Sequence, residues 1–348
     1  MRFNQTTLLN IALIVIFGLA LTQAEAYMGD YQIYILKLIF INAILALSLN
    51  LIYGFTGLFS LGHAGFMSVG AFSGIIAAMS LQSAVPNDLV RMIVALVVGA
   101  FFAAIVGFIV GIPVLRLRGD YLAIVTLAFG EIIKDLINCL LVGWDENGLH
   151  IALNVDGTKS MSSLGLSENG IEIIKGAQGA TGNARIATFA MGFALVMITL
   201  VVVLNLVRSR TGRAIMAIRD NRIAAESVGI NVTKYKLIAF VTSASLAGAA
   251  GALFGLNYSN VTAVQFDFNT SILVLVYVVL GGLGNIWGSI VATVVLYVLP
   301  EALRQFSDYR MLVYAIVLIL VMLATNNPTL KSFFARLKPG KKEEKEAV

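Results

Sequence analysis

Long apolar runs alternate with short polar intervals along most of the chain. Ten such runs are visible, at about 8–21, 31–53, 54–81, 89–114, 121–142, 187–207, 237–258, 271–283, 286–299 and 311–325. A helix needs about 20 mostly apolar residues to cross the hydrocarbon core of a bilayer, so 271–283 and 286–299 are near the short limit. The pattern predicts an all-α fold, a polytopic transmembrane helical bundle of about ten spans.

Three of these runs have features beyond their length. The run 8–21 follows Arg2 and ends at Ala24-Glu25-Ala26, as a signal peptide would, although we favour an uncleaved first helix. The run 54–81 is rich in Gly and polar residues, which predicts a broken or re-entrant element that lines a cavity. The run 237–258 is dense in Ala, Gly and Ser, so we expect it to pack closely against other helices.

Composition agrees with a membrane protein. Hydrophobic residues make up 59% of the 348 positions and charged residues 12%, whereas soluble proteins carry about 25% charged residues. The net charge of +5 comes from basic residues in short intervals beside the apolar runs. The tendency of such loops to stay in the cytoplasm explains this charge better than nucleic-acid binding does. With one Cys and two His, the sequence has no disulfide framework and no Cys-rich or His-rich metal site.

The interval 208–236 is the only long polar interval that is strongly basic. Its basic residues are Arg208, Arg210, Arg213, Arg219, Arg222, Lys234 and Lys236. They predict a cytoplasmic loop, which places both termini inside and the intervals 143–185 and 259–270 outside. Good helix formers from Thr211 to Val228 predict a helix lying across the cytoplasmic face, a surface on which another protein acts.

The expected organisation is therefore one transmembrane domain, 1–330, and a short tail. The domain includes an external loop or small subdomain at about 143–185 and the basic cytoplasmic loop at about 208–236. The tail, 331–348, is charged and contains K-K-E-E-K-E, so we expect it to be disordered.

Charged residues within an apolar run are candidates for function. Glu131, Lys134 and Asp135 lie in the run 121–142, where a charge at the bilayer centre costs at least about 2.5–3.5 kcal/mol on insertion scales. Glu131 falls about halfway across the membrane, counted from Asp120. An internal ion pair and a place near a transport path are both open interpretations.

Two uncharged polar residues are further candidates for lining such a path. His63 lies in S-L-G-H-A-G, and Asn50 lies near the end of the run 31–53. Each is also explained by a structural hydrogen bond between helices. Gly281, Gly282 and Gly284 are typical of a tight turn with close packing.

Motifs for chemistry are absent from the sequence. It contains no G-x-x-x-x-G-K-[ST] phosphate loop, no H-E-x-x-H and no Ser/His/Asp spacing typical of a hydrolase. We therefore predict that the chain is not an enzyme, needs no cofactor and contains no ATPase of its own.

Four segments in the same order resemble one known family. They are 51–66 (L-I-Y-G-F-T-G-L-F-S-L-G-H-A-G-F), 115–133 (beginning L-R-L-R-G-D-Y-L), 208–240 (beginning R-S-R-T-G-R-A-I) and 278–289 (V-V-L-G-G-L-G-N-I-W-G-S). The chain resembles the membrane permease subunits of bacterial branched-chain amino acid ABC importers, of the LivM type. The resemblance implies a plasma-membrane complex with a second permease subunit, two cytoplasmic ATPase subunits and an extracytoplasmic substrate-binding protein.

The resemblance also implies roles for residues of the basic interval. Importers of this kind carry E-A-A-x-x-x-G where they dock on the ATPase, and Ala224, Ala225 and Gly229 match it while Ile223 replaces the acid. Together with Arg213, Arg219 and Arg222, which the basic surface provides, these residues are the candidate coupling site.

The sequence departs from the family at V-G-W-D-E-N-G-L, 142–149, where many members read T-G-G-x-x-G-L. This difference lies on the side expected to meet the binding protein, so other substrates of related permeases stay open as alternatives. A urea or short-amide permease of the related family is one alternative. An ion-coupled secondary transporter using Glu131 and His63 as a proton relay is another, and a channel is a third.

Overall fold

The computed structural model describes residues 27–303 apart from 83, 118, 147, 155–160, 168 and 169, together with the single positions 312, 313, 315, 316 and 319. The predicted run 8–21, most of 311–325 and the tail 331–348 lie outside the described residues. The chain divides into two compact units, Met1–Thr293 and Val294–Val348. The second unit contains the C-terminal part of helix α11 (Ile286–Ala302), and the account below concerns the first.

Six helical segments among the described residues are long and apolar enough to cross a membrane. They are Asp30–Phe55 (helix α2, Asp30–Asn50, with the π-helical turn η1, Leu51–Phe55), His63–Ser80 (α3), Asp88–Val114 (α4), Phe189–Arg208 (α6), Val232–Gly255 (α9) and Ala263–Gly281 (the 3-10 turn η4, Ala263–Phe266, with α10, Phe268–Gly281). These confirm a mainly helical membrane protein. The ten-span count and the placement of both termini inside stay predictions.

Two further helices that belong to predicted spans do not meet the length and hydropathy required of a membrane span. Helix α5 (Asp120–Asn138) carries Asp120, Glu131, Lys134 and Asp135 within its length. Helix α11 is apolar but has only 17 residues.

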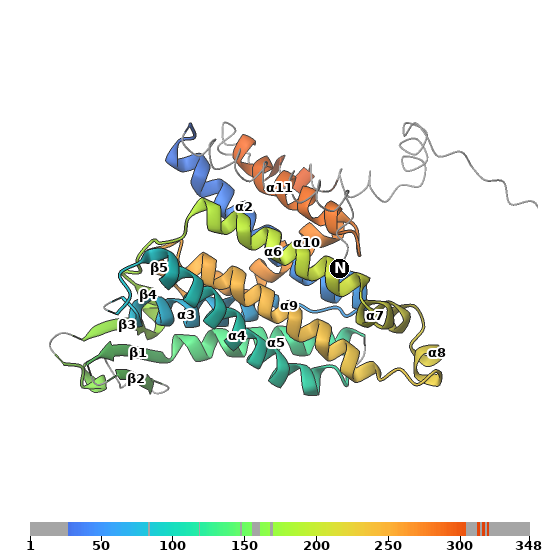
Figure 1. Cartoon of the computed structure of the whole chain (residues 1–348), viewed down its shortest axis with the longest axis horizontal. Coiled ribbons are helices and arrows are strands. Elements are labelled where there is room, and N and C mark those ends of the chain that lie inside the picture. Colours follow the sequence, from blue (N-terminus) through green and yellow to red (C-terminus); the bar gives the residue numbers. More distant parts are fainter. Residues whose placement is uncertain are drawn as a thin grey trace, which may run out of the picture. The chain divides into compact units, whose positions relative to one another are not determined.

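Helix α9 lies at the centre of the first unit and packs against α2, α3 and α4 (Figure 1). The small residues of α9 allow this packing, because they let the backbones of two helices come close together. A Cβ added at Gly70 of α3 would lie 2.0 Å from the carbonyl oxygen of Gly248, and one at Gly248 would lie 2.3 Å from Cβ of Ala103 of α4. The prediction that 237–258 packs helix on helix is therefore confirmed.

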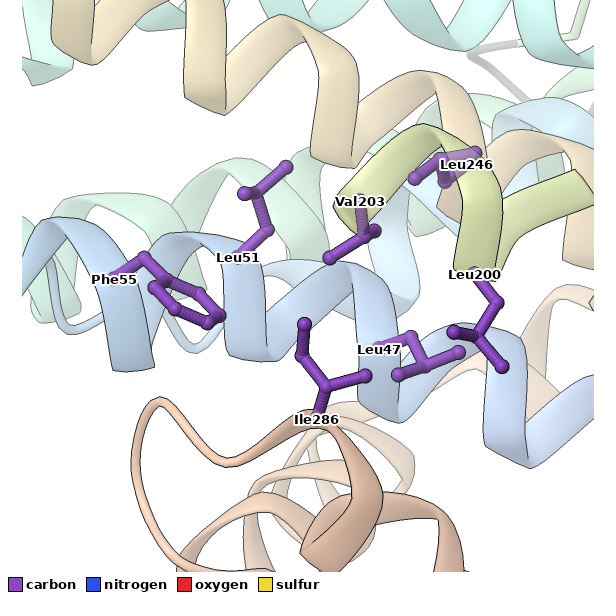
Figure 2. Packing of buried hydrophobic residues seen from close by; sticks show 7 residues of the cluster. All are labelled: Leu47, Leu51, Phe55, Leu200, Val203, Leu246 and Ile286. Carbon is purple, nitrogen blue, oxygen red and sulfur yellow. The ribbon is translucent and has the colours of Figure 1, made fainter. Parts of the chain in front are cut away.

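A cluster of buried side chains joins the membrane helices on another side of α2 (Figure 2). It contains Leu47, Leu51, Phe55, Leu200, Val203, Leu246 and Ile286, which come from α2, η1, α6, α9 and the start of α11. Burial of apolar area from water stabilises such clusters in soluble proteins, but in lipid the close packing itself matters more. The cluster fixes η1 against the helix that leads into the basic segment.

The run 54–81 is interrupted, as its composition predicts. Helix α2 ends in the π-helical turn η1, residues 57–62 are irregular, and α3 starts at His63. The irregular segment lies against α5, where the backbone N–H of Leu61 donates to Oγ1 of Thr126 at 3.0 Å. Leu58 and Ser60 are buried, whereas Gly57 is exposed and lines a cavity with Leu58 and Phe59, so this non-helical backbone is partly covered by protein.

The expectation of an all-α chain is wrong in one region, because the interval 143–185 contributes most of a sheet. Its five strands are antiparallel, in the order β2-β1-β3-β4-β5. Their bounds are β1 Leu140–Asp145, β2 Gly148–Leu153, β3 Ile171–Lys175, β4 Ala180–Thr181 and β5 Asn260–Val261, with 3-10 turns η2 Met161–Leu164 and η3 Gly176–Gln178 between them. Asp145 pairs with Gly148, so the first hairpin joins β1 and β2 through the two positions 146 and 147.

The sheet joins the two intervals that the charge pattern assigns to the same side of the membrane. Strand β5 follows α9, and it pairs with β4 from the interval 143–185. In Figure 1 the strands lie at one end of the helices, and the helices of the basic interval lie at the other end. The positions of these two polar regions therefore agree with the predicted sidedness.

Candidate coupling surface and buried polar contacts

The basic interval forms two helices where one was expected. Helix α7 spans Arg210–Asp220 and helix α8 spans Arg222–Ser227. The break falls at Asn221, whose backbone is extended (φ −152°, ψ 103°) and whose Oδ1 accepts a hydrogen bond from the N–H of Ala224 at 3.1 Å. Asn is among the best residues at a helix N-cap, so it starts a new helix in place of continuing the old one.

The inner side of these two helices is apolar and packed. Ile218 of α7 and Ala225 of α8 are buried together with Val232 of α9, and Ile230 and Tyr235 pack against them. The segment is therefore held as a fixed platform beneath the membrane helices, and it is not a mobile connector.

The outer side exposes the remaining coupling candidates together with two large apolar side chains. Ile223 is 80% exposed and Val228 is 74% exposed. Arg222 pairs with Glu226 at 2.8 Å, from Nε to Oε1. Arg213, Ala224 and Gly229 are also exposed, whereas Ala225, the other small residue of the motif, is buried. An apolar side chain beside charged neighbours is typical of a protein-binding surface.

A cavity of about 500 Å³ opens beside this platform. Its lining combines the end of α2 and the irregular segment, the start of α5, and two basic residues of the interval: Tyr53, Gly57, Leu58, Phe59, Leu117, Gly119, Asp120, Leu122, Arg222 and Lys236. The cavity thus lies between the platform and the membrane helices at one place.

The side chain of Arg219 is 38% exposed, yet it donates a hydrogen bond to the backbone of a membrane segment. Its Nη1 donates to the carbonyl oxygen of Gly54 in η1 at 2.9 Å. Its Nε and Nη2 donate to Oδ1 of Asp220 at 3.1 and 3.0 Å. The neighbouring carboxylate thus fixes the plane of the guanidinium and leaves Nη1 to donate to the membrane helix.

Asn50 lies at the end of α2 and is buried. Its Nδ2 donates to the carbonyl oxygen of Asn285 at 3.2 Å and to Oγ of Ser289 at 3.0 Å. Its Oδ1 accepts from the N–H of Gly284 at 2.9 Å. The side chain therefore binds the turn between α10 and α11, and its place along a passage stays a prediction.

His63 is fully buried at the start of α3. Its Nε2 lies 2.7 Å from Oγ of Ser48, and that hydroxyl donates to the carbonyl oxygen of Leu45 at 2.9 Å. The hydroxyl oxygen can therefore accept only from an Nε2 that carries the proton. Ser243 of α9 donates to the carbonyl oxygen of Ser48, so these contacts tie α2, α3 and α9 together.

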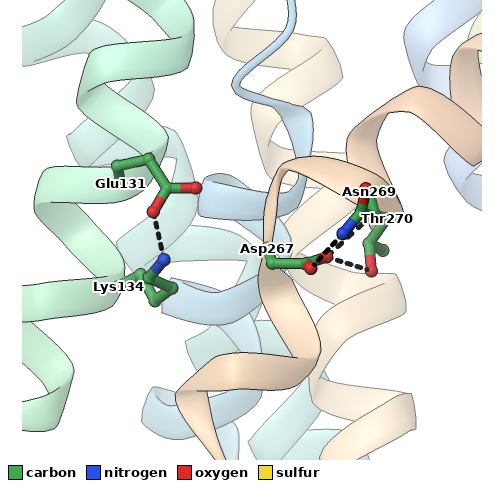
Figure 3. A network of polar contacts seen from close by, with 5 residues as sticks. All are labelled: Glu131, Lys134, Asp267, Asn269 and Thr270. Atoms are coloured by element: carbon green, nitrogen blue, oxygen red, sulfur yellow. Dashed lines mark hydrogen bonds and ion pairs between the residues drawn. The ribbon is translucent and has the colours of Figure 1, made fainter.

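Glu131 forms an ion pair with Lys134 one turn further along α5 (Figure 3). The Glu131 side chain is 37% exposed and that of Lys134 is 22% exposed. Figure 3 also shows Asp267 at the start of α10, where its carboxylate accepts from the N–H of Thr270 at 3.0 Å and from Asn269 Nδ2 at 2.8 Å. The ion pair is one of the two interpretations of Glu131 made from the sequence.

Comparison with known proteins decides the family. Residues 31–322 match the family described as branched-chain amino acid transport system permease component. The chain belongs to this family. The match covers the described membrane helices and the basic interval, so the resemblance noted from the four segments is confirmed.

Individual relatives of this permease agree with the family. Two proteins named as the high-affinity branched-chain amino acid transport system permease protein LivM, from Salmonella typhimurium and Escherichia coli, are each 34% identical to it over 303 residues, which is 85% of this permease and 68% of the relative. A ribose import permease, RbsC of Escherichia coli, is 26% identical over 336 residues, which is 91% of this permease and 92% of the relative. No solved structure matches this permease.

The sequence did not indicate two contacts of this permease. They are the bond from Arg219 to Gly54 and the bonds from Asn50 to the α10–α11 turn, and they join residues 165 and 234 positions apart. The only hint was compositional, since Gly54 and Gly284 lie in Gly-rich stretches. Glycine marks places where backbones come close, but it does not say which backbones meet.

Proposed function

We propose that this permease forms half of the translocation pathway of an ATP-driven importer for branched-chain amino acids in a bacterial cytoplasmic membrane. The identity to the two LivM proteins, 34%, supports this substrate class over sugars, since the ribose permease RbsC is 26% identical. The other subunits of the importer are a second permease, two ATPases and an extracytoplasmic binding protein.

The coupling surface, residues 208–236, is where the ATPase binds. The observation that carries this part is the pair of exposed apolar side chains, Ile223 and Val228, on helices whose opposite side is packed against the protein. Exposing two large apolar side chains to water is unfavourable, and burial in a pocket of a partner protein removes them from water. Arg213, Arg219 and Arg222, with Ala224 and Gly229, make up the rest of this surface, and Ala225 packs beneath it.

The sheet, at the opposite end of the helices, faces the extracytoplasmic binding protein. Among the candidates for the pathway, Glu131 has an accessible side chain, while Asn50 and His63 are buried. Glu131 is therefore accessible to a passage formed between two permease subunits, whereas Asn50 and His63 are not. His63 binds Ser48 and Glu131 binds Lys134, so their contacts do not favour a proton relay between them.

The deciding experiment is transport by the reconstituted complex of all these subunits in liposomes. Uptake of labelled leucine should require ATP on the ATPase side and continue when an ionophore collapses the proton gradient. Uptake that stops with the gradient while ATP persists would show an ion-coupled transporter. Uptake of urea or ribose in place of leucine would keep the transporter class and overturn the substrate.

A further inference from the structure

We infer that Arg219, the carbonyl group of Gly54 and the side chain of Asn50 form a link that transmits movement of the coupling surface to the turn between α10 and α11. The inference rests on the proposed coupling function and names the residues that carry it into the membrane. It assigns Asn50 a positioning role, which differs from the role of lining a passage.

The first half of the link depends on how helix α2 ends. The last carbonyl groups of a helix have no partner within the helix, and a buried carbonyl without a donor is costly. Here the helix ends in the π-helical turn η1 and then in irregular backbone, so Gly54 lies where the regular pattern stops. Its carbonyl oxygen accepts from Nη1 of Arg219 at 2.9 Å. A side chain of the coupling surface therefore donates a hydrogen bond to a backbone carbonyl at the end of a membrane helix.

The second half lies one helical turn earlier. Asn50 makes two hydrogen bonds to the turn between α10 and α11, with the N–H of Gly284 and the carbonyl oxygen of Asn285, and a third to the hydroxyl of Ser289 in α11. Asn50 is 1% exposed, so solvent offers no alternative partners. Any displacement of η1 along or about its axis must either move this turn or break these bonds.

Close packing makes the junction rigid. A Cβ at Gly54 would lie 1.9 Å from Oδ1 of Asn50 and 2.3 Å from the N–H nitrogen of Gly284. Gly284 itself has φ +77°, and the nearest atoms to a Cβ placed there would be the Gly54 carbonyl oxygen at 3.5 Å and Nη1 of Arg219 at 3.7 Å. Three segments far apart in the sequence thus meet without space between them, as transmission by contact requires.

The orientation of Arg219 explains why this residue and not another arginine fills the role. Asp220 accepts from two of its N–H groups and holds the guanidinium plane, which leaves Nη1 for Gly54. Arg213 on the same helix is exposed, and its Nη1 lies 3.5 Å from the carbonyl oxygen of Arg208, at the limit of a hydrogen bond within its own segment.

The test is a double-mutant cycle in the complete reconstituted importer, read as leucine uptake per ATP hydrolysed. Arg219→Gln and Asn50→Ala should each lower this ratio by about tenfold, because each removes hydrogen bonds to buried groups. The double variant should also show about a tenfold loss, since both changes interrupt one link. A loss of about a hundredfold would show two independent effects and overturn the inference.

Matched variants separate the link from general damage. Arg219→Lys keeps a cationic donor for the carbonyl oxygen of Gly54, so leucine uptake per ATP hydrolysed should stay close to the value of the unaltered complex. Asn42→Ala removes an amide of the same helix α2 whose Nδ2 donates to the carbonyl oxygen of Leu38 within that helix, and should leave uptake per ATP unchanged. If Asn50→Ala fails to assemble, Ser289→Ala removes one of its partners and should lower the ratio less, by about threefold. No change with either Ser289→Ala or Arg219→Gln in an assembled complex would refute the link.

A second readout does not depend on transport. A spin label at Leu283→Cys, an exposed position of the α10–α11 turn, in a Cys139→Ser background, reports the mobility of the turn. Binding of the ATPase subunits to the purified permease should change its spectrum, and Arg219→Gln should abolish the change without preventing binding. A change that persists in Arg219→Gln would overturn the link even if import is confirmed. An Arg219-dependent change without leucine import would leave the link standing and refute the proposed substrate.

Discussion

Replacing Ile223 by Ala should weaken binding of the ATPase subunits without affecting the fold of the permease. The side chain is 80% exposed in the isolated chain. The substitution removes three carbon groups, each contributing about 0.8 kcal/mol when buried, so a site that covers it on docking loses about 2 kcal/mol. That free energy corresponds to an increase in Kd of about thirtyfold.

The measurement is a titration of the detergent-purified permease with its ATPase subunits, together with thermal unfolding of the permease alone. Ile218→Ala on α7 is the matched control, because the same atoms are removed from a side chain that is only 4% exposed. It should lower the thermal stability by about 2–4 kcal/mol, whereas Ile223→Ala should leave the stability unchanged. An unaltered Kd in Ile223→Ala would show that this side chain is not covered by the ATPase, and the docking surface would have to lie elsewhere.

Three further predictions follow from the packing and the charges. Gly248→Ala places a Cβ 2.3 Å from that of Ala103 and should destabilise the permease by about 1–3 kcal/mol, measured as loss of thermal stability in detergent, whereas Gly29→Ala meets no atom within 4 Å and should have no such effect. Glu131→Gln should leave uptake dependent on ATP and insensitive to an ionophore; an abolished ATP-driven uptake in a stable complex would instead assign Glu131 an essential place in the pathway. Reversing the charges of Arg219 and Arg222 to Glu should uncouple ATP hydrolysis from uptake or prevent assembly while the protein still inserts, and unchanged uptake would contradict the coupling role.

The membrane helices could be predicted because the signal for them is local. Whether a segment of about 20 residues enters a bilayer depends on its own apolar content, and the runs that became α4, α6 and α9 carry that content without help from other segments. The basic interval and the small residues of α9 are similarly visible in the sequence, since charge bias and close helix packing each depend on residue type. The interrupted run 54–81 belongs to the same class, because its Gly and polar residues weaken a regular helix.

The sheet and the division of the basic interval were missed for a different reason. A strand is stabilised by partners across the sheet, and β5 is separated from its partner β4 by the whole of α6, α7, α8 and α9. The interval 143–185 therefore appeared as a polar loop in the sequence. Asn221 was similarly treated as one position in a helix-rich stretch, when its side chain caps a second helix.

What the sequence determined by itself was the class of molecule: a membrane-embedded helical permease with a basic platform at one face. What only the tertiary structure decided was which polar groups meet inside it. Arg219, Asn50 and His63 are each compatible with several roles in isolation, since a hydrogen-bonding side chain takes its role from its partner. The partners are Gly54, the turn at 284–289 and Ser48, and only the folded chain brings them within hydrogen-bond distance.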